Sequence, residues 1–520
     1  MQNRVTLHPF YSSTLINMKI LTGGQFRELD LYTIQNEPVA SLELMERASR
    51  AVADEILRRW SDPSQRVFVF SGPGGNGGDG LAVARLLAEA GREVTAYLFN
   101  VKGTLNPDCE QNRDRLLQTE GATLVEVTQE LVFPELRADD LVIDALFGTG
   151  LSKPLSGGFA LVAKRMNQSQ ATIISIDVPS GLMCEDNTYN DTSNIIRASA
   201  TLSIQLPKLA FLYPENQRFV GEFTLLPIGL SEEGLEQLKS HLWLTEEAEV
   251  RALLRPRPRF AHKGTMGHAL LVTGSYGMAG AAILSARAAL RTGLGKLTLH
   301  LPEACLNILQ SAVPEAVVQT DLDERCISTA LDANGFQAVG IGPGLGRDPH
   351  TATALLHYLQ QQEAPMVIDA DALNILSEHQ DWLRLLSPDS ILTPHPRELD
   401  RLVGHSSNSY ERMNRARNLA VTHKVFVILK GHFTQICTPT GAVLFNPTGN
   451  PGMATPGSGD VLTGIITSLL AQGYLPIEAA QIGVYLHGLA GDLAAAELSE
   501  ESLLASDIIQ FLPAAFKKLK

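Results

Sequence analysis

The feature that most constrains the fold is a series of short apolar segments that alternate with helical ones. Segments such as "RVFVFS", "LVIDALFG" and "TIISIDVPSG" are rich in Val, Ile and Leu and close at Gly, Ser or Asp. Continuous apolar runs of this length are typical of parallel strands that are buried on both faces. Between them, segments such as "GLAVARLLAEAG" have helical spacing. The pattern predicts a Rossmann-like, doubly wound α/β sheet.

This alternation stops at about residue 229 and starts again at about residue 262. The intervening stretch is charged and then proline-rich, and a chain of 520 residues is too long for one core. We therefore predict two tandem α/β domains, residues 18–235 and 236–520. Residues 1–17 lack the basic start and apolar centre of a signal peptide. They are predicted to be an extension that is disordered, or untranslated if Met18 is the initiator.

Charge and cysteine content narrow the class of partner. The net charge of -14 argues against nucleic acid or an anionic membrane as the main partner. The five cysteines form no C-x-x-C motif, which fits reduced thiols in a cytoplasmic protein. No apolar run approaches the roughly 18 to 20 residues of a membrane span. We expect small-molecule partners, including phosphate-bearing ones that backbone amides can hold.

The stretch "SGPGGNGGDG" follows the first strand and matches the G-x-G-x-x-G pattern of dinucleotide-binding loops at Gly72, Gly74 and Gly77. An ordinary NAD-binding fold places an acid about 20 residues further on, at the end of the next strand. Here that strand ends at Asn100. The match alone is therefore weak evidence for a dehydrogenase.

Other strands of this half end in carboxylates, Asp144 in "VIDALFGTGL" and Asp177 in "SIDVPSGL". Ligands of open α/β sheets bind outside the carboxyl ends of the strands, so Asn76, Asp144 and Ser180 are expected to converge. Such oxygen donors suit a hard cation, and the glycines leave room for a pyrophosphate. For either Asp alone, capping of a following turn or helix explains the residue equally well.

"GPGGNGGDG", "VIDALFGTGL" and "IDVPSGL" resemble the motifs of NAD(P)H-hydrate epimerases, over about residues 18–228. The resemblance implies a K⁺ ion held by Asn76, Asp144 and Ser180. The implied substrate contacts are Gly75, Asn76, Gly77, Gly78, Asp79, Gly148, Thr149, Gly150, Leu151, Ser152, Lys153, Pro154 and Asp177. We predict Asp177 as the catalytic acid/base because it is ionisable and matches a ligand-contacting position. The family more often has Asn where this chain has Gly75.

The second half carries its most specific motif late, in "GNPGMATPGSGDVLTGI". The amides of Gly457, Ser458 and Gly459 precede a helix and are predicted to form an anion hole. Asp460 either caps this helix or accepts a proton from a hydroxyl that attacks a phosphoryl group. The sequence contains no G-x-x-x-x-G-K-[ST] motif, which excludes a P-loop mechanism.

G-S-G-D, with "HKGTMGHALLVTGS", "GIGPGLG", "VIDADALN", "LTPHPREL" and "VILKG", resembles the ADP- or ATP-dependent NAD(P)H-hydrate dehydratases of the ribokinase-like superfamily, over about residues 245–520. The implied hydrate contacts are Ala281, Gly344, His395 and Asp460. The implied contacts with the adenylate portion of the nucleotide are Lys430, Gly431, His432, Phe433, Thr434 and Gly459. The chain departs from the family at Pro456, where Gly is commoner. Taken alone, His395 is a turn residue and Asp371 a helix cap as readily as ligand contacts.

Together the two resemblances imply a bifunctional repair enzyme for hydrated nicotinamide cofactors, NADHX and NADPHX. The first domain is expected to interconvert R and S epimers, and the second to dehydrate the S epimer. In the second domain, Asp460 is expected to deprotonate the C6 hydroxyl as this hydroxyl attacks the terminal phosphoryl group of the nucleotide. Mg²⁺ and the anion hole are expected to stabilise the charge on the transferring group. Phosphate then leaves, and AMP is the nucleotide product if ADP is used.

Several points stay open in the sequence. The family leans towards ADP over ATP and towards homo-oligomers, while the preference between NADHX and NADPHX is written in no motif. One alternative is a sugar or vitamin-precursor kinase, which makes a stable phosphorylated product. Another treats the first domain as a non-catalytic ligand-sensing module, although its three cation ligands, Asn76, Asp144 and Ser180, are present.

Overall fold

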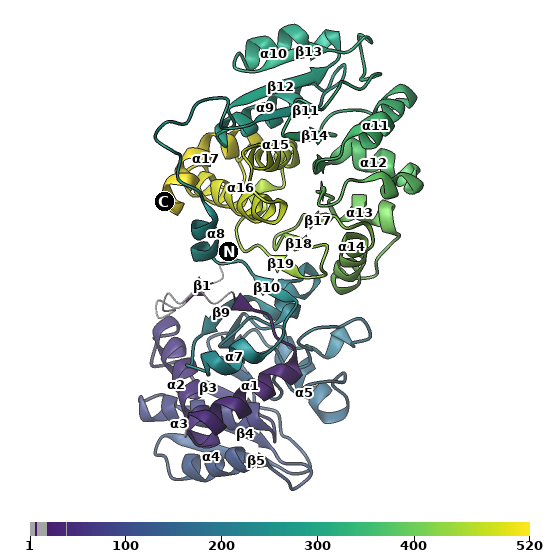
Figure 1. Ribbon diagram of the computed structural model, residues 1–520. Coiled ribbons are helices and arrows are strands. Elements are labelled where there is room, and N and C mark those ends of the chain that lie inside the picture. The colour runs from purple at the N-terminus through teal and green to yellow at the C-terminus, as the bar shows by residue number, and fades with distance from the viewer. Residues whose placement is uncertain (1–5, 8–17, 38) are drawn as a thin grey trace. The chain divides into compact units, whose positions relative to one another are not determined.

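The computed structural model describes residues 6–7, 18–37 and 39–520. The chain forms two compact units that separate between Ser240 and His241, a few residues beyond the boundary expected from the sequence. Purple to blue-green ribbon traces the first unit in Figure 1, and teal through yellow traces the second. Of the predicted extension 1–17, only the short strand β1 (Thr6–Leu7) is among the described residues.

The first unit contains an eight-stranded sheet in the order β1-β9-β8-β7-β6-β3-β4-β5, with parallel pairing throughout. After β1 its strands are β3 (Val67–Ser71), β4 (Val94–Phe99), β5 (Ala122–Val127), β6 (Leu141–Ala145), β7 (Thr172–Ile176), β8 (Ala200–Ile204) and β9 (Glu222–Leu226). From β3 the chain adds strands on one side, and from β6 it adds them on the other. The reversal between β3 and β6 is the point at which such sheets bind ligands.

Helices cover both faces of this sheet because alternate side chains of each strand point to opposite faces. In β3, Val67 and Val69 belong to one apolar cluster, while Phe68 and Phe70 belong to another. The helices are α1 (Gly23–Asn36), α2 (Ser41–Arg59), α3 (Gly75–Glu89), α4 (Pro107–Leu117), α5 (Gly157–Gln168), α6 (Gln217–Val220) and α7 (Glu232–Gln237). Short 3-10 turns are η1 (Thr192–Asn194), η2 (Leu209–Leu212) and η3 (Pro214–Asn216), and the short strand β2 (Met18–Lys19) precedes α1.

The glycine-rich stretch differs from the loop that the sequence predicts, because α3 already begins at Gly75. Its first turn packs directly on main-chain atoms. A Cβ on Gly77 would overlap the Gly72 carbonyl, and a Cβ on Gly72 would overlap the Leu146 carbonyl. Any side chain larger than hydrogen at Gly72 or Gly77 would therefore push the start of α3 away from these main-chain atoms. Asn76 and Asp79 lie on the first turns of this closely packed helix.

The second unit has its own sheet, and from β13 the order runs β13-β12-β11-β14-β15-β16-β17-β18-β19-β10. The strands are β10 (Leu242–Leu244), β11 (His268–Val272), β12 (Lys296–Leu301), β13 (Val317–Thr320), β14 (Ala338–Ile341), β15 (Met366–Ile368), β16 (Ile391–Leu392), β17 (Phe426–Leu429), β18 (Gln435–Cys437) and β19 (Val443–Phe445). Pairing is parallel from β13 to β17 and antiparallel from β17 to β19. The order reverses between β11 and β14, which predicts the ligand site of this unit.

The helices of this unit also fall on two sides of the sheet (Figure 1). The first group is α8 (Glu247–Leu253), α9 (Ala279–Arg291), α10 (Leu306–Ala312), α15 (Ser458–Ala471), α16 (Pro476–Leu498) and α17 (Ala505–Leu519). The second is α11 (Pro349–Gln361), α12 (Ala370–Glu378), α13 (Pro396–Val403) and α14 (Ser409–His423). Three 3-10 turns, η4 (Glu303–Cys305), η5 (Gln380–Leu385) and η6 (Pro451–Met453), complete the set.

Helix α15 is the centre of the second unit. Every residue from Val461 to Ala471 is buried, as expected for a helix that is apolar on all sides. A Cβ on Gly464 would overlap the Ser285 carbonyl of α9, so glycine permits this close crossing of α15 and α9.

The predicted pair of tandem α/β units with parallel sheets is confirmed. Among the described residues, no helix is both long and apolar enough to pass through a membrane.

Candidate active sites

Asp144 occupies the strand-order reversal of the first unit, at the carboxyl end of β6, and is fully buried. Its Oδ2 accepts hydrogen bonds from Ser175 Oγ at 2.7 Å and the Ser180 amide at 2.8 Å. Its Oδ1 accepts one from the Leu146 amide at 3.3 Å. Burial raises the pKa of Asp144, and these bonds oppose the rise. Within the described chain no cationic side chain pairs with it, so a bound cation would balance its charge.

Asn76 and Ser180 meet Asp144 around the segment that follows β6. Ser180 Oγ accepts from the Phe147 amide at 2.9 Å and donates to the Phe147 carbonyl at 3.1 Å. A Cβ on Gly148 would lie 3.2 Å from Asn76 Oδ1. The buried Nδ2 of Asn76 has no hydrogen-bond partner in the described residues. Turning the Asn76 side-chain amide by 180° puts its oxygen at the position of Nδ2, where it can act as a neutral ligand for a cation. The donor set therefore fits K⁺.

The other residues implied in hydrate binding divide into two groups. Gly75 to Asp79 form the first turns of α3, and Gly148 lies against Asn76. Thr149 also belongs to this region, because a Cβ on Gly23 at the start of α1 would lie 2.5 Å from its carbonyl oxygen. Further along the same loop, Ser152, Lys153 and Pro154 are exposed. They have no contact with the cation ligands among the described interactions.

Asp177 follows β7 and adopts a left-handed backbone conformation, with φ of 65°. This is uncommon for a residue other than glycine and often marks a functional site. Its Oδ1 accepts from the Ile204 amide at 3.0 Å and forms an ion pair with Lys208 Nζ. Lys208 is fully buried and also donates to Ser203 Oγ at 2.9 Å and the Ile204 carbonyl at 3.0 Å. All three ammonium protons are thus engaged.

Two more carboxyl groups face the Asp177–Lys208 pair, Asp79 from α3 and Asp30 from α1. Burial, then the charges of Asp177 and Asp30, raise the pKa of Asp79 well above its usual range. Burial, then the charge of Asp177, raise the pKa of Asp30 to about 7, with Lys208 opposing. Burial and neighbouring negative charge thus both favour the protonated forms of Asp79 and Asp30. Such a cluster is suited to proton transfer.

In the second unit, Asp460 lies in the first turn of α15, which begins at Ser458 after the N-cap Gly457. Asp460 is therefore not the N-cap of α15, although capping was one interpretation of this residue from the sequence. Burial, then the charge of Asp369, raise the pKa of Asp460 to about 7, and Lys430 opposes them. Near neutral pH this carboxyl group can therefore accept a proton.

The anion hole is smaller than predicted. The Ser458 amide donates to the Thr455 carbonyl at 3.3 Å, so the expectation that it is free is wrong. The amides of Gly457 and Gly459 have no acceptor among the described residues. The partly buried ring of His487 fixes this end of the helix, since its Nε2 donates to the Ser458 carbonyl at 2.9 Å. Burial lowers the pKa of His487 to about 4, so the ring is neutral.

Lys430, at the end of β17, points towards the same place. Its Nζ lies 2.8 Å from Oδ1 of the buried Asp369, and Thr463 Oγ1 donates to Asp369 Oδ2 at 2.8 Å. A Cβ on Gly459 would lie 3.3 Å from Lys430 Nζ. Burial disfavours the charge of Lys430, but Asp369 and Glu398 outweigh it and raise its pKa. The ammonium group therefore stands charged beside the anion hole.

His395 caps α13, in place of the simple turn that the two prolines around it suggest. Its Nδ1 accepts from the amides of Arg397 at 3.1 Å and Glu398 at 3.4 Å. Its Nε2 lies 3.4 Å from Glu398 Oε1. Burial, then the charge of Lys430, lower the pKa of His395. A neutral ring that presents Nε2–H can donate a hydrogen bond to a ligand.

The glycine-rich loops of this unit form a narrow cradle at the reversal between β11 and β14. A Cβ on Gly344 would lie 2.8 Å from Ala281 Cβ and 2.9 Å from the Met278 carbonyl. These contacts unite two residues that the sequence assigned to hydrate binding, Ala281 and Gly344. The neighbouring Asp371 does not cap α12, because its Oδ2 accepts from the Gly346 amide at 2.9 Å.

The remaining predicted nucleotide contacts form the turn between β17 and β18. The Gly431 amide donates to Thr434 Oγ1 at 3.3 Å, and that hydroxyl donates to the Gly431 carbonyl at 2.9 Å. The rings of His432 and Phe433 meet edge to face at 4.7 Å. An aromatic turn of this kind offers a surface for a purine ring.

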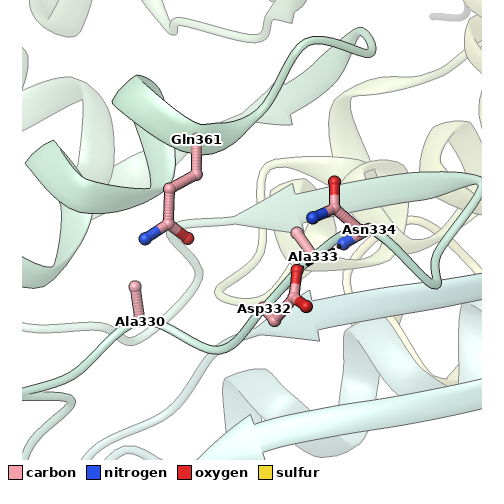
Figure 2. Close-up of a pocket in the computed structure, with 5 residues that line it drawn as sticks. All are labelled: Ala330, Asp332, Ala333, Asn334 and Gln361. Carbon is pink, nitrogen blue, oxygen red and sulfur yellow. Dashed lines mark hydrogen bonds between the residues drawn. The ribbon is translucent and has the colours of Figure 1, made fainter.

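Figure 2 shows a pocket of about 460 Å³ lined by Ala330, Asp332, Ala333, Asn334 and Gln361. These residues precede β14 and β15 in the chain, so the pocket lies at the amino ends of those strands. Asp369 and Gly342 follow the same strands and mark the opposite edge of the sheet. The pocket also contains no cationic side chain and is not the phosphate site.

Several residues of both sites escaped the analysis of the sequence. Asp369 had a usable signal, since it ends a buried strand as Asp144 does. Glu398 was also within reach, three residues after His395 at the start of a helix. Lys208 and Asp30 carried no signal, because a single charged residue near an apolar segment resembles an ordinary surface residue. In the described part of the chain no three His, Cys, Asp or Glu side chains form a metal site.

Comparison with known proteins assigns both units. A family model described as NAD(P)H-hydrate dehydratase matches residues 269–514. Another, described as the N-terminus of YjeF-related proteins, matches residues 41–210.

Whole-length relatives combine both regions in one chain. A bifunctional NAD(P)H-hydrate repair enzyme from Moorella thermoacetica is 35% identical over 97% of each chain. The enzyme of the same name from Thermofilum pendens is 34% identical, again over 97% of each chain. The solved ADP/ATP-dependent NAD(P)H-hydrate dehydratase of Bacillus subtilis, crystallised with ATP and Mg²⁺, is 33% identical. It aligns over 53% of this chain and 98% of its own, with a TM-score of 0.45.

Proposed function

The chain belongs to the family of bifunctional NAD(P)H-hydrate repair enzymes, and on this premise we propose how its residues divide the work. The first unit is the epimerase and the second is the nucleotide-dependent dehydratase. The observation that carries the proposal for the second unit is the position of Asp460, a proton-accepting carboxylate beside the unpaired amides of Gly457 and Gly459.

We propose that Asp460 removes the proton from the C6 hydroxyl of the S hydrate as that oxygen attacks the terminal phosphoryl group. The Gly457 and Gly459 amides, with Lys430, stabilise the negative charge that is transferred. The C6–O bond then breaks, phosphate leaves with the bonding electrons, and loss of a proton from C5 to solvent forms the C5=C6 double bond of NAD(P)H. Lys430 acts here on phosphate, in contrast to the adenylate contact that the sequence implied, because its Nζ lies next to Gly459.

The negative charge of the nucleotide phosphates would add to that of Asp369 and Asp371, which lie around Asp460. Lys430 alone does not balance this negative charge. This excess of carboxylate fits Mg²⁺ held jointly by acidic residues and the nucleotide. When bound, the ion would supply Lewis-acid stabilisation of the phosphoryl oxygens. We propose ADP as the co-substrate. Residence in the cytoplasm, a homo-oligomeric state and the nucleotide contacts of residues 431–434 stay predictions.

In the first unit, we propose that Asn76, Asp144 and Ser180 hold K⁺ and that the glycine turn of α3 holds the hydrate. The uncompensated carboxylate of Asp144 and the orphaned amide of Asn76 support the cation. Asp177 takes part in proton transfer at C6, and this is supported by its place beside a buried lysine and two carboxyl groups, Asp30 and Asp79, whose pKa values are raised.

The test is an assay of separated R and S epimers of hydrated NADH with the full chain. With ADP and Mg²⁺, the S epimer should regain the absorbance of NADH without a lag and the R epimer only as fast as it epimerises. Phosphate and AMP should appear in equal amounts. A stable phosphorylated organic product would instead identify a kinase, and ATP outperforming ADP would correct the co-substrate.

A further inference from the structure

Helix α1 lies outside every motif recognised in the sequence and outside the matched residues 41–210, yet it contributes to the epimerase site. Lys208 Nζ lies 4.5 Å from the centre of the Phe26 ring, in cation–π geometry. Gly23 lies so close to Thr149, in the hydrate-binding loop, that a Cβ there would lie 2.5 Å from its carbonyl oxygen. A Cβ on Gly150 would lie 3.8 Å from the Arg27 guanidinium.

Asp30 lies one helical turn after Phe26, and residues four apart share a helix face. The face that holds the aromatic ring against Lys208 therefore also presents the Asp30 carboxyl group. The charged groups around it are Asp177 and Lys208, and Asp79 from α3 faces the same cluster. Asp30 is only partly buried, whereas Phe26 beside it is buried. Among the described residues, no hydrogen-bond donor engages the Asp30 carboxyl group.

The other carboxyl groups are less suited to carry the mobile proton. Asp177 Oδ1 already accepts from Lys208 and the Ile204 amide. Asp79 is held by Ser49, whose Oγ lies 3.4 Å from its Oδ1, and its pKa lies well above its usual range. Burial and the charge of Asp177 raise the pKa of Asp30 to about 7, so its carboxyl group can both give and regain a proton near neutral pH.

We propose that Asp30 is a further catalytic residue of the epimerase site, the acid that protonates the C6 hydroxyl, and that Lys208 is a positioning residue that holds Asp177 beside it. The inference rests on the proposed epimerase function of the first unit. Asp30 gives its proton to the hydroxyl as the C6–O bond breaks, and water leaves with the bonding electrons. The ring nitrogen lone pair forms the C6=N1 bond of the cation. Water then adds to the other face of C6, and its extra proton returns through solvent to the Asp30 carboxylate.

The test compares Asp30→Asn with Glu28→Gln, an exposed control on the same helix, in the full chain with K⁺. Asp30→Asn should lower kcat for conversion of the R to the S epimer by about 100-fold or more with little change in KM. Wild-type kcat, corrected for the uncatalysed reaction, should fall as pH rises through about 7, because the donor is the protonated form. Asp30→Asn should lose this dependence, and Lys208→Met should shift it. ADP-dependent dehydration of the S epimer, measured in the same samples, should stay unchanged and so report that the second unit is folded.

Wild-type epimerisation in Asp30→Asn, with the same pH profile, would overturn the inference and leave the proposed function intact. So would loss of activity in Asp79→Asn together with normal activity in Asp30→Asn. A wild-type chain that does not interconvert the epimers at all would instead refute the epimerase function. Asp30→Glu should recover part of the rate, which a purely structural role of Asp30 would not require.

Discussion

Lys430 Nζ and Asp369 Oδ1 lie 2.8 Å apart, and the pair joins the end of β17 to the end of β15 beneath the anion hole. Asp369 is 1% exposed, so its charge depends on this lysine and on Thr463. Removing one partner from a buried ion pair leaves a charge that neither water nor protein compensates. The same lysine faces the phosphate site, which couples stability and catalysis in one side chain.

Lys430→Met should therefore destabilise the second unit, by about 3 kcal/mol, and also lower ADP-dependent dehydration by at least about 100-fold. Thermal unfolding and phosphate release measure the two effects. Lys517→Met, at an exposed position on α17, is the matched control and should change neither. An unaltered rate in Lys430→Met would show that Lys430 serves only the ion pair.

Asp460→Asn should abolish recovery of NADH, since an amide cannot accept the hydroxyl proton, and the loss should be about 100-fold to 10,000-fold. In the wild type, dehydration should rise with pH through about 7, because the ionised form is the base. Initial rates from pH 5.5 to about 9 at saturating ADP give this profile. A dehydration rate that does not rise with pH in this range would assign the proton transfer to another group.

The same pKa has a consequence for folding. The pKa of folded Asp460 is raised from 3.8 to about 7, so the folded state binds its proton more tightly than the unfolded state. Stability linked to this group is therefore fully present below about pH 4 and is lost as pH rises through 7. Asp460→Asn should unfold at a higher temperature than wild type at pH 8, with a smaller difference at pH 5. Equal shifts at both pH values would contradict the proposed cause.

Asn76→Ala should weaken K⁺ binding in the epimerase reaction, because it removes the amide oxygen of the proposed ligand set. The K⁺ concentration for half-maximal epimerisation should rise about 10-fold or more. Replacing K⁺ by Li⁺ in the wild type should likewise slow epimerisation and leave dehydration unchanged. An epimerisation rate that is the same with K⁺ and Li⁺, in both the wild type and Asn76→Ala, would contradict the proposed cation site.

Gly77→Ala should disrupt the start of α3, since its Cβ would overlap the Gly72 carbonyl. Overpacking of this kind costs about 1–3 kcal/mol, so epimerase activity and the stability of the first unit should both fall. Gly75→Ala is the matched control, because nothing lies within 4 Å of a Cβ there. Similar unfolding curves for both variants would mean that the helix start can shift to make room.

The order of strands and helices follows from apolar segments of strand length between helical ones, because burial on both faces leaves little choice of residue. The strand-end rule likewise placed Asp144 and Asn76 together. It missed Lys208 and Asp30 because their meeting depends on tertiary packing: α1 contacts a segment more than 150 residues later. The start of α3 was missed for a related reason, since glycines that disfavour an isolated helix are required by its close packing on β3.

The contacts of Gly72, Gly77 and Leu146 have a broader consequence for how such a site can change. Its frame consists of main-chain atoms in direct contact, so the place proposed for the hydrate does not depend on which side chains line the opening. The residue at position 75 can therefore vary, as Gly75 does from the Asn commoner in the family, without moving the frame. Substrate preference can drift in this enzyme while its chemistry stays in place.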